Sequence, residues 1–292
     1  MSSDRLFDRL FRAHAAIALV FLYAPIVLVV LFSFNAGERT GELRGLSTRW
    51  YGAVFDDRFA IAALRNSLVV ASWTTLFATT FGTMAGLAVD RTPRAFRAVF
   101  DAVTYIAIII PGIVIAIATL LLFVNLFAWL NPWLAYIGSS FGVTVPVLGS
   151  GLHTIVAAHV LFTMAIVIVL IRTRLAGMDR TLIEASADLY AGPWRTFRQV
   201  TLPELLPAIL AGALLSFTFS WDDFIIAQFV AGPGQNTLPM YVFASIRRGV
   251  TPEINAIAAM ILAVTLSVLA MAWIGYRRQA ARVRGGVAAD AA

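Results

Sequence analysis

Six long apolar stretches follow one another along the chain, and only the fifth contains acidic residues. A helix of about 22 residues is about 33 Å long, which is enough to cross the ~30 Å hydrocarbon layer of a bilayer. The stretches lack the period-2 alternation of a membrane β-barrel, and backbone groups in lipid must be bonded internally. The pattern therefore predicts an all-α membrane protein with six transmembrane helices, over 13–34, 67–89, 102–123, 151–171, 205–230 and 254–276.

Arginine sets the expected orientation, since cytoplasmic loops carry the excess of basic residues. With the N-terminus inside, 15 of the 22 basic residues fall in inner segments and 7 in outer ones. We expect residues 1–12 to be a cytoplasmic N-terminus, 13–276 a six-helix domain and 277–292 a cytoplasmic tail. The first stretch is too long for a signal-peptide core, and Phe34 does not suit a cleavage site, so we interpret it as retained.

Composition narrows the chemistry further: 60% of residues are hydrophobic, 13% are charged, and there is no cysteine and no lysine. Disulfides, Cys-ligated metals, Schiff bases and the lysine of a P-loop are therefore excluded. If the protein takes part in ATP-driven work, another chain must bind the ATP. The net charge of +6 does not indicate nucleic acid, because the arginines are spread between the apolar stretches. We see no metal-ligand motif and no nucleophile–base pair, which predicts a chain without catalytic residues.

The longest inner connection, 172–207, has the composition of two short helices. Asp179 or Thr181 can cap the first, with Glu184 in its first turn, and Gly192-Pro193 is expected to end it. A second helix over 194–200 then leads through Leu202-Pro203 into the fifth span. The pair could dock a partner, lie on the headgroups as an amphipathic surface, or cap the bundle.

Outer residues 125–150 carry no charge but contain Trp129, Trp133 and Tyr136, which favours an interfacial hairpin or short helix.

Pro111-Gly112 interrupts the third span, either as a hinge or as a packed kink. Gly82 and Gly86 have the small-xxx-small spacing of close helix packing.

Asp222 and Asp223 are the costliest residues in the predicted spans, because a carboxylate in lipid is unfavourable by ~2.5 kcal/mol or more. They could line the route of a cationic solute, with Trp221 offering a cation–π surface. Alternatively, they could pair with Arg247 or Arg248 or cap a broken helix. Other polar residues in or near spans could line a path or only bridge helices, namely Asn66, Asn125, Asn131, His153 and His159.

The inner connection resembles the EAA loop of ABC-importer permeases. The matching residues are Glu184-Ala185-Ser186 and, at the family spacing, Val200-Thr201-Leu202-Pro203. The sequence departs from the pattern at Ser186, where the family has Ala, and at Tyr190, where the family has Gly and this chain has its glycine at Gly192. We expect this departure to shift the turn between the two helices.

Most of the chain is similar to spermidine/putrescine-type permeases, in particular the second permease subunit. The similarity rests on Pro25, residues 33–35, 47–51, 66–67 and 216–223, and on a C-terminal group that includes Gly232-Pro233, Leu238-Pro239 and residues 252–256.

The resemblance implies the MetI-like type I importer fold in a bacterial inner membrane, with both termini cytoplasmic. It implies a second permease subunit, two ATP-binding subunits that hold ATP and magnesium, and an extracytoplasmic solute-binding protein; no cofactor is expected on this chain. The solute would be a polyamine, with an aminoalkylphosphonate, opine or amino acid as alternatives. An intramembrane enzyme or a membrane scaffold is a less favoured function for the chain. The residues that inherit the ATPase-docking role are Glu184, Ala185, Ser186, Leu189, Tyr190, Gly192, Leu202 and Pro203; the expected path residues are Trp221, Asp222, Asp223, Asn66 and Asn125.

Overall fold

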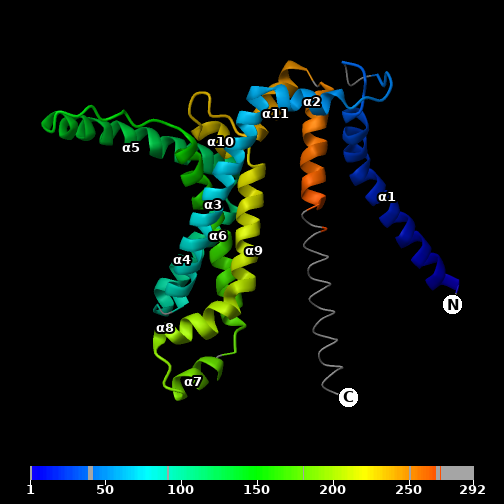
Figure 1. Cartoon of the computed structure of the whole chain (residues 1–292). Helices are drawn as coiled ribbons and strands as arrows, with labels where there is room; N and C mark the ends of the chain where they lie inside the picture. Colours follow the sequence, from blue (N-terminus) through cyan, green and yellow to red (C-terminus); the bar gives the residue numbers. More distant parts are fainter. Residues whose placement is uncertain are drawn as a thin grey trace. The chain divides into compact units, whose positions relative to one another are not determined.

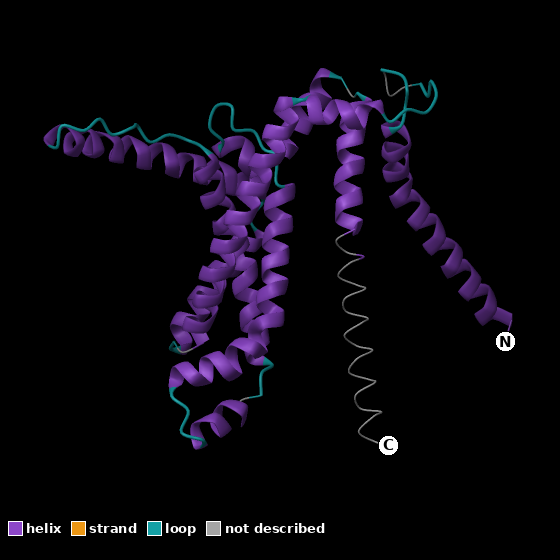
Figure 2. Cartoon of the chain, viewed as in Figure 1, coloured by secondary structure: helices purple, strands orange, loops and turns teal. Residues whose placement is uncertain are grey.

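The computed structural model describes residues 2–38, 42–90, 92–179, 181–249, 251–267 and 270. These residues are helical apart from loops and one isolated bridge between Asn35 and Leu46, as Figure 2 shows. The chain forms two compact units, one of Met1–Ile61 with Val242–Ala292 and one of Ala62–Tyr241. The expected all-helical fold is confirmed.

The helices follow the order labelled in Figure 1. They are α1 (Ser2–Ser33), α2 (Arg49–Asp56), α3 (Arg58–Asp90), α4 (Arg94–Ile109), α5 (Gly112–Ser140), α6 (Leu152–Ala176), α7 (Thr181–Asp188), α8 (Pro193–Thr196), a π-helical turn (Phe197–Thr201), α9 (Leu202–Asp222), α10 (Ile225–Val230) and α11 (Leu238–Arg248). A further apolar helix spans Pro252–Ser267.

Five of the described helices are long and apolar enough to cross a membrane: Phe7–Ser33, Arg58–Asp90, Gly112–Ser140, Leu152–Ala176 and Pro193–Asp222. Four of them contain or overlap the first, second, fourth and fifth predicted spans. The sixth span begins as expected with Pro252–Ser267. Most of its remainder, and the predicted tail 277–292, lie outside the described residues.

The third predicted span, 102–123, is wrong as a single helix. The backbone is extended at Ile110 (ψ 132°) and Pro111 (ψ 136°), so α4 ends before them and α5 starts after them. Proline has no N–H to continue the helical ladder, and the residue before it is pushed toward extended backbone. The long apolar helix is instead α5, which runs on to Ser140 into the region 125–150, where the sequence favoured an interfacial hairpin or short helix.

The segment after α5 returns along it as an extended chain, so the two form a hairpin (Figure 1). Asn131 fastens the return: its Oδ1 accepts from the Leu148 N–H at 2.8 Å, and its Nδ2 donates to the Leu148 carbonyl at 3.1 Å. Asn131 therefore bridges α5 and the segment that returns along it.

Glycines allow α3, α6 and α9 to approach closely. A Cβ at Gly82 would lie 2.8 Å from Val167, and a Cβ at Gly86 would lie 2.9 Å from Ile171 Cγ2. From α9, a Cβ at Gly212 would lie 3.3 Å from Val167 Cγ2. Val167 and Ile171 are fully buried, so α6 is held between small-residue positions of its two neighbours. The expected packing role of Gly82 and Gly86 is confirmed.

In the other unit, the buried Asn35 organises the segment after α1. Its Oδ1 accepts from the Gly37 and Arg44 N–H groups, both at 3.0 Å, and its Nδ2 donates to the Glu42 carbonyl at 2.7 Å. Trp50 Nε1 donates to the Asn35 carbonyl at 2.8 Å. Residues 33–35 and 47–51, which carry part of the family resemblance, thus form one hydrogen-bonded turn region.

We predict that Gly82→Ala lowers the free energy of unfolding by roughly 1–3 kcal/mol, because the added methyl meets the Val167 side chain in a packed core. Unfolding of the detergent-solubilised protein would measure it. Gly52→Ala is the matched control, since a Cβ at Gly52 in α2 meets nothing within 4 Å. Equal stabilities of the two variants would contradict the proposed packing.

Candidate functional site

The inner connection begins with a capped helix. The Thr181 N–H donates to Asp179 Oδ1 at 2.9 Å, which satisfies a free amide in the first turn of α7. This backbone bond, with a further bond from the Thr181 side chain, lowers the pKa of Asp179 below its ordinary value. The cap is therefore fully formed at neutral pH and is lost as the pH falls through that lowered pKa. Glu184 lies in the first turn of α7 and is exposed.

The end of α7 differs from the sequence expectation, because the helix stops at Asp188 and not at Gly192-Pro193. Tyr190 has φ +57°, a left-handed conformation that glycine adopts without strain. Two backbone bonds fix the turn: Tyr190 N–H to the Ala187 carbonyl at 2.9 Å, and Ala191 N–H to the Ser186 carbonyl at 3.0 Å. The turn therefore stays at the family's glycine position, with Tyr190 in it, and the expected shift is wrong. Gly192 is extended and caps α8.

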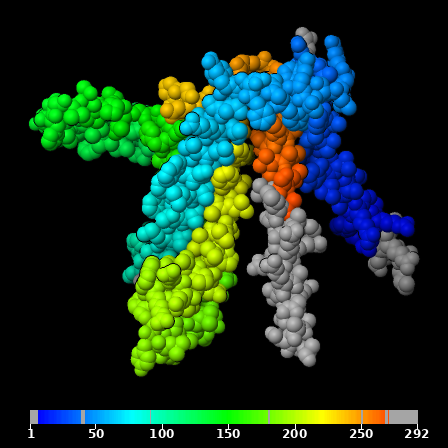
Figure 3. Space-filling view, in the orientation of Figure 1, coloured from blue at the N-terminus to red at the C-terminus, as the bar shows by residue number. Residues whose placement is uncertain are grey.

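Ser186, the other departure from the family pattern, links the two short helices. Its hydroxyl bonds the Ile183 carbonyl at 2.8 Å and lies 2.9 Å from Thr196 Oγ1. An alanine could make neither bond. In Figure 3 the segment around α7 and α8 forms a protruding end of its unit, and the side chains that it exposes include Leu189 and Tyr190.

The second short helix is not separate from the fifth span, because the chain is helical from Pro193 to Asp222. The π-helical turn Phe197–Thr201 leads directly into Leu202-Pro203, the first two residues of α9. A widened turn relieves the clash that the Pro203 ring would have with the carbonyl four residues earlier. Arg174 ties α6 to this region: its Nη2 lies 2.7 Å from Glu204 Oε2, and its Nε donates to the Glu204 carbonyl at 2.8 Å.

At the other end of this long helix, the chain breaks between Asp222 and α10. Asp223 is extended (ψ 127°), and its Oδ2 accepts from the Ala227 N–H at 2.9 Å, so it caps α10. The same oxygen lies 3.1 Å from His159 Nε2, and His159 Nδ1 lies 2.8 Å from Ser220 Oγ. The capping alternative for Asp223 is therefore seen, and His159 is a hydrogen-bonded bundle histidine.

The Ser220–His159–Asp223 chain contains the residue types of a hydrolase triad, but its geometry differs. In a hydrolase, the imidazole Nε2 faces the serine and Nδ1 faces the aspartate; here the two nitrogens are exchanged. Ser220 is 4% exposed and His159 is 2% exposed, so neither is open to a substrate. The arrangement bridges α6 to the break after α9.

Asp222 contrasts with its neighbour: it is exposed, and among the described residues it has no hydrogen-bond or ion-pair partner. Trp221 stacks on Phe217 with ring centroids 5.9 Å apart. Arg247 lies over the Phe243 ring, and Arg248 donates to Ser245. Asp222 thus offers a free carboxylate at the end of a membrane helix.

The loop between α10 and α11 gathers residues that are far apart in sequence. Asn66 Nδ2 donates to the Asn236 carbonyl at 2.9 Å, and Ser67 Oγ accepts from the Leu238 N–H at 2.7 Å. Gln235, which sequence reasoning did not select, accepts from the Leu152 N–H at 2.6 Å. Nothing in its sequence position marks it except the preceding Gly-Pro-Gly turn. Asn66 therefore anchors this loop to α3.

Asn125 belongs to none of these hydrogen-bonded groups and donates to the Leu121 carbonyl of its own helix at 2.7 Å.

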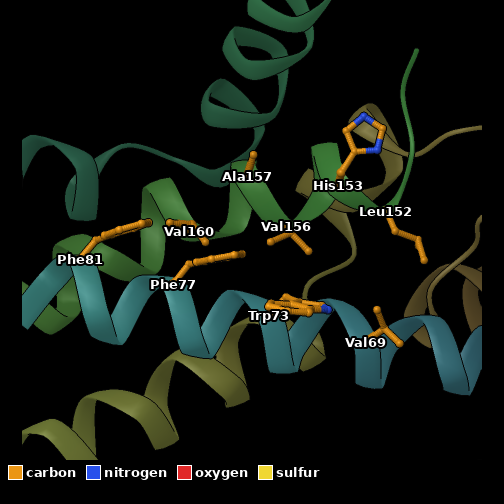
Figure 4. A pocket seen from close by; sticks show the side chains of 9 residues that line it. All are labelled: Val69, Trp73, Phe77, Phe81, Leu152, His153, Val156, Ala157 and Val160. Atoms are coloured by element: carbon orange, nitrogen blue, oxygen red, sulfur yellow. The ribbon is translucent and has the colours of Figure 1, made fainter. Parts of the chain in front are cut away.

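A groove of about 640 Å³ lies between α3 and α6, and in Figure 4 Trp73 and Phe77 face Val156 and Val160 across it. Its lining residues are Val69, Trp73, Phe77, Phe81, Leu152, His153, Val156, Ala157 and Val160. The groove is thus apolar, and Asp222 is not among the residues that line it. No group of three or more His, Asp or Glu that could hold a metal occurs in the described part of the chain.

Comparison with known proteins adds three findings. A family model described as binding-protein-dependent transport system inner membrane component matches residues 78–285. The putrescine transport system permease protein PotI of Escherichia coli K12 is 41% identical over 255 residues, covering 87% of this chain and 85% of PotI. The spermidine/putrescine transport system permease protein PotC of the same strain is 30% identical over 246 residues, covering 84% and 86%.

Among solved structures, the fold is similar to a chain of the bacterial alginate ABC transporter in complex with alginate pentasaccharide-bound periplasmic protein. The TM-score is 0.71 at 15% identity, over 92% of this chain and 93% of that one. The likeness in fold supports the expected importer architecture.

We predict that Asp223→Ala lowers the free energy of unfolding by roughly 2 kcal/mol, since it removes the α10 cap and leaves Nε2 of the buried His159 without its partner. Asp222→Ala is the matched control and should stay within about 0.5 kcal/mol of the unchanged protein. Unfolding in detergent compares the two. Equal losses would show that the cap does not stabilise the break.

Proposed function

Since the chain belongs to the family of binding-protein-dependent transport system inner membrane components, we propose that it is the permease subunit of an ATP-driven importer whose solute is a polyamine. Its membership makes it a multi-pass inner-membrane protein and a non-catalytic subunit. The polyamine assignment is supported by relatives named for putrescine and for spermidine/putrescine transport.

The observation that carries the solute class is the unpartnered carboxylate of Asp222. A carboxylate at a membrane helix end is unfavourable unless it faces water, a partner or a charged solute. An aliphatic polyamine carries several ammonium groups, so one can pair with Asp222 while another approaches the Trp221 ring. A solute with its own carboxylate or phosphonate would be repelled at this position.

Asp223 acts on the path indirectly. Its bonds to Ala227 and His159 use its carboxylate within the protein, so it positions the break and leaves Asp222 to the solute. Asn66 and the loop it anchors have the same positioning role, while Asn125 bonds only its own helix. The proposed solute contacts are thus Asp222 and Trp221.

Four other subunits complete the proposed assembly: a second permease, two ATP-binding subunits that hold ATP and magnesium, and an extracytoplasmic solute-binding protein. The ATP-binding subunit would bind the segment Thr181–Pro203 on the cytoplasmic side of the membrane, where both termini are also proposed to lie. Because the chain is helical from Pro193 to Asp222, a displacement of this segment moves the start of a helix that ends at the solute carboxylate. Closure of the ATP-binding pair would then shift the balance between inward-open and outward-open states.

We predict that Glu184→Arg reduces solute uptake at least about tenfold, because reversing a charge at a docked interface costs more than ~1.4 kcal/mol. ATP hydrolysis by the reconstituted importer should persist but lose its response to the solute-binding protein. Asp8→Arg in α1 makes the same charge change at an exposed position and should leave uptake unchanged. Full uptake in the Glu184 variant would refute docking at this segment.

We predict that Asp222→Asn raises the KM for putrescine uptake about three- to tenfold, as expected for loss of one partly solvated ion pair. Uptake of labelled putrescine into proteoliposomes that contain the whole importer measures it. Asp56→Asn at the end of α2, an exposed carboxylate, is the charge-matched control. An unchanged KM would remove Asp222 from the path.

A further inference from the structure

Tyr190 stands out because it is the one non-glycine residue with positive φ in the described part of the chain. Left-handed backbone is unfavourable for a residue with a Cβ, and more so for a bulky one. The side chain is nevertheless 97% exposed, so no contact within the chain offsets the strain. An exposed side chain at a strained position indicates a role outside the chain.

The backbone around Tyr190 is fixed, so the Cα–Cβ bond of Tyr190 has a fixed direction. The turn is held by the bonds from Tyr190 to Ala187 and from Ala191 to Ser186. Ser186 in turn is linked to Thr196 of α8 at 2.9 Å. Tyrosine has only two side-chain torsions and so loses little conformational entropy on binding, which suits an interface anchor.

The segment around Tyr190 exposes apolar side chains, with acidic residues before Tyr190 on α7 and the basic Arg195 and Arg198 after it. Leu189 is 82% exposed and Trp194 is 72% exposed. Glu184 and Asp188 are both exposed and lie four residues apart on α7, so they share one face of the helix. The complementary surface is an apolar pocket, with basic side chains opposite the acidic face of α7.

We infer that Tyr190, with Leu189, is an anchor that fills an apolar pocket of the ATP-binding subunit and thereby selects the subunit that this permease accepts. The inference rests on the proposed function, in which that subunit docks at this segment. The strain at Tyr190 is retained because glycine, which would relieve it, has no ring to insert.

The test uses Tyr190→Gly and Tyr190→Asn, which tolerate the left-handed backbone and lack the ring, and Tyr190→Phe, which keeps the ring. The full permease pair is held in nanodiscs, and its affinity for the purified ATP-binding subunit is measured together with its thermal stability. We expect the Gly and Asn variants to bind at least about tenfold more weakly while remaining as stable as the unchanged protein, because a buried aromatic anchor dominates an interface of this kind. The Phe variant should bind within about threefold of the unchanged protein.

Glu184→Arg in the same assay separates the two proposals. If it weakens binding and Tyr190→Gly does not, the docking segment stands and the anchor is refuted. If neither variant weakens binding, or if the unchanged permease fails to bind the subunit, docking at this segment and the anchor are both refuted. Tighter binding by Tyr190→Gly would mean that the strain serves no contact, which also refutes the anchor.

Discussion

Satisfaction of polar groups in lipid is the constraint on which this structure depends. A broken helix in a membrane exposes backbone N–H and C=O groups that neither water nor a neighbouring turn can reach. At the break after α9, the Asp223 carboxylate supplies the missing acceptor for Ala227, and the buried His159 supports that carboxylate from α6. Because this cap lets the backbone turn, the adjacent Asp222 can end its helix with a free side chain.

The same helix connects the two proposed functional regions of the chain. From Pro193 to Asp222 it has 30 residues, which corresponds to roughly 45 Å of helix. Its start is joined to α7 through Ser186 and Thr196, and its early part is joined to α6 through Arg174 and Glu204. Val167 packs against Gly212 in its middle. A pull on the inner segment therefore acts on a packed rod and not on a flexible connection.

Sequence patterns were informative where one residue type has one physical consequence. The apolar stretches gave the spans, the glycine spacing gave the α3–α6 contact, and Pro111 marked a break. Patterns were not informative where partners come from distant elements. The pairing of His159 with Ser220 and Asp223, and of Gln235 with the start of α6, depends on how α6, α9 and α10 pack. The third span was misplaced because the apolar run continues on both sides of Pro111, and only the backbone shows which side forms the long helix.

The residues that depart from local rules form two groups: one group is used by hydrogen bonds within the protein, and the other is proposed to contact a partner or solute. Asp223, Ser186 and Asn35 look unfavourable in isolation, yet each forms hydrogen bonds within the protein. Asp222 and Tyr190 are different: one is a free carboxylate, the other a strained and exposed ring. Consistency between local and global structure is the rule in folded chains, and the exceptions concentrate at functional sites. Asp222 ends the helix that starts at Pro193, and Tyr190 lies just before that start, so the two exceptions lie where we propose that the importer binds its solute and its ATP-binding subunit.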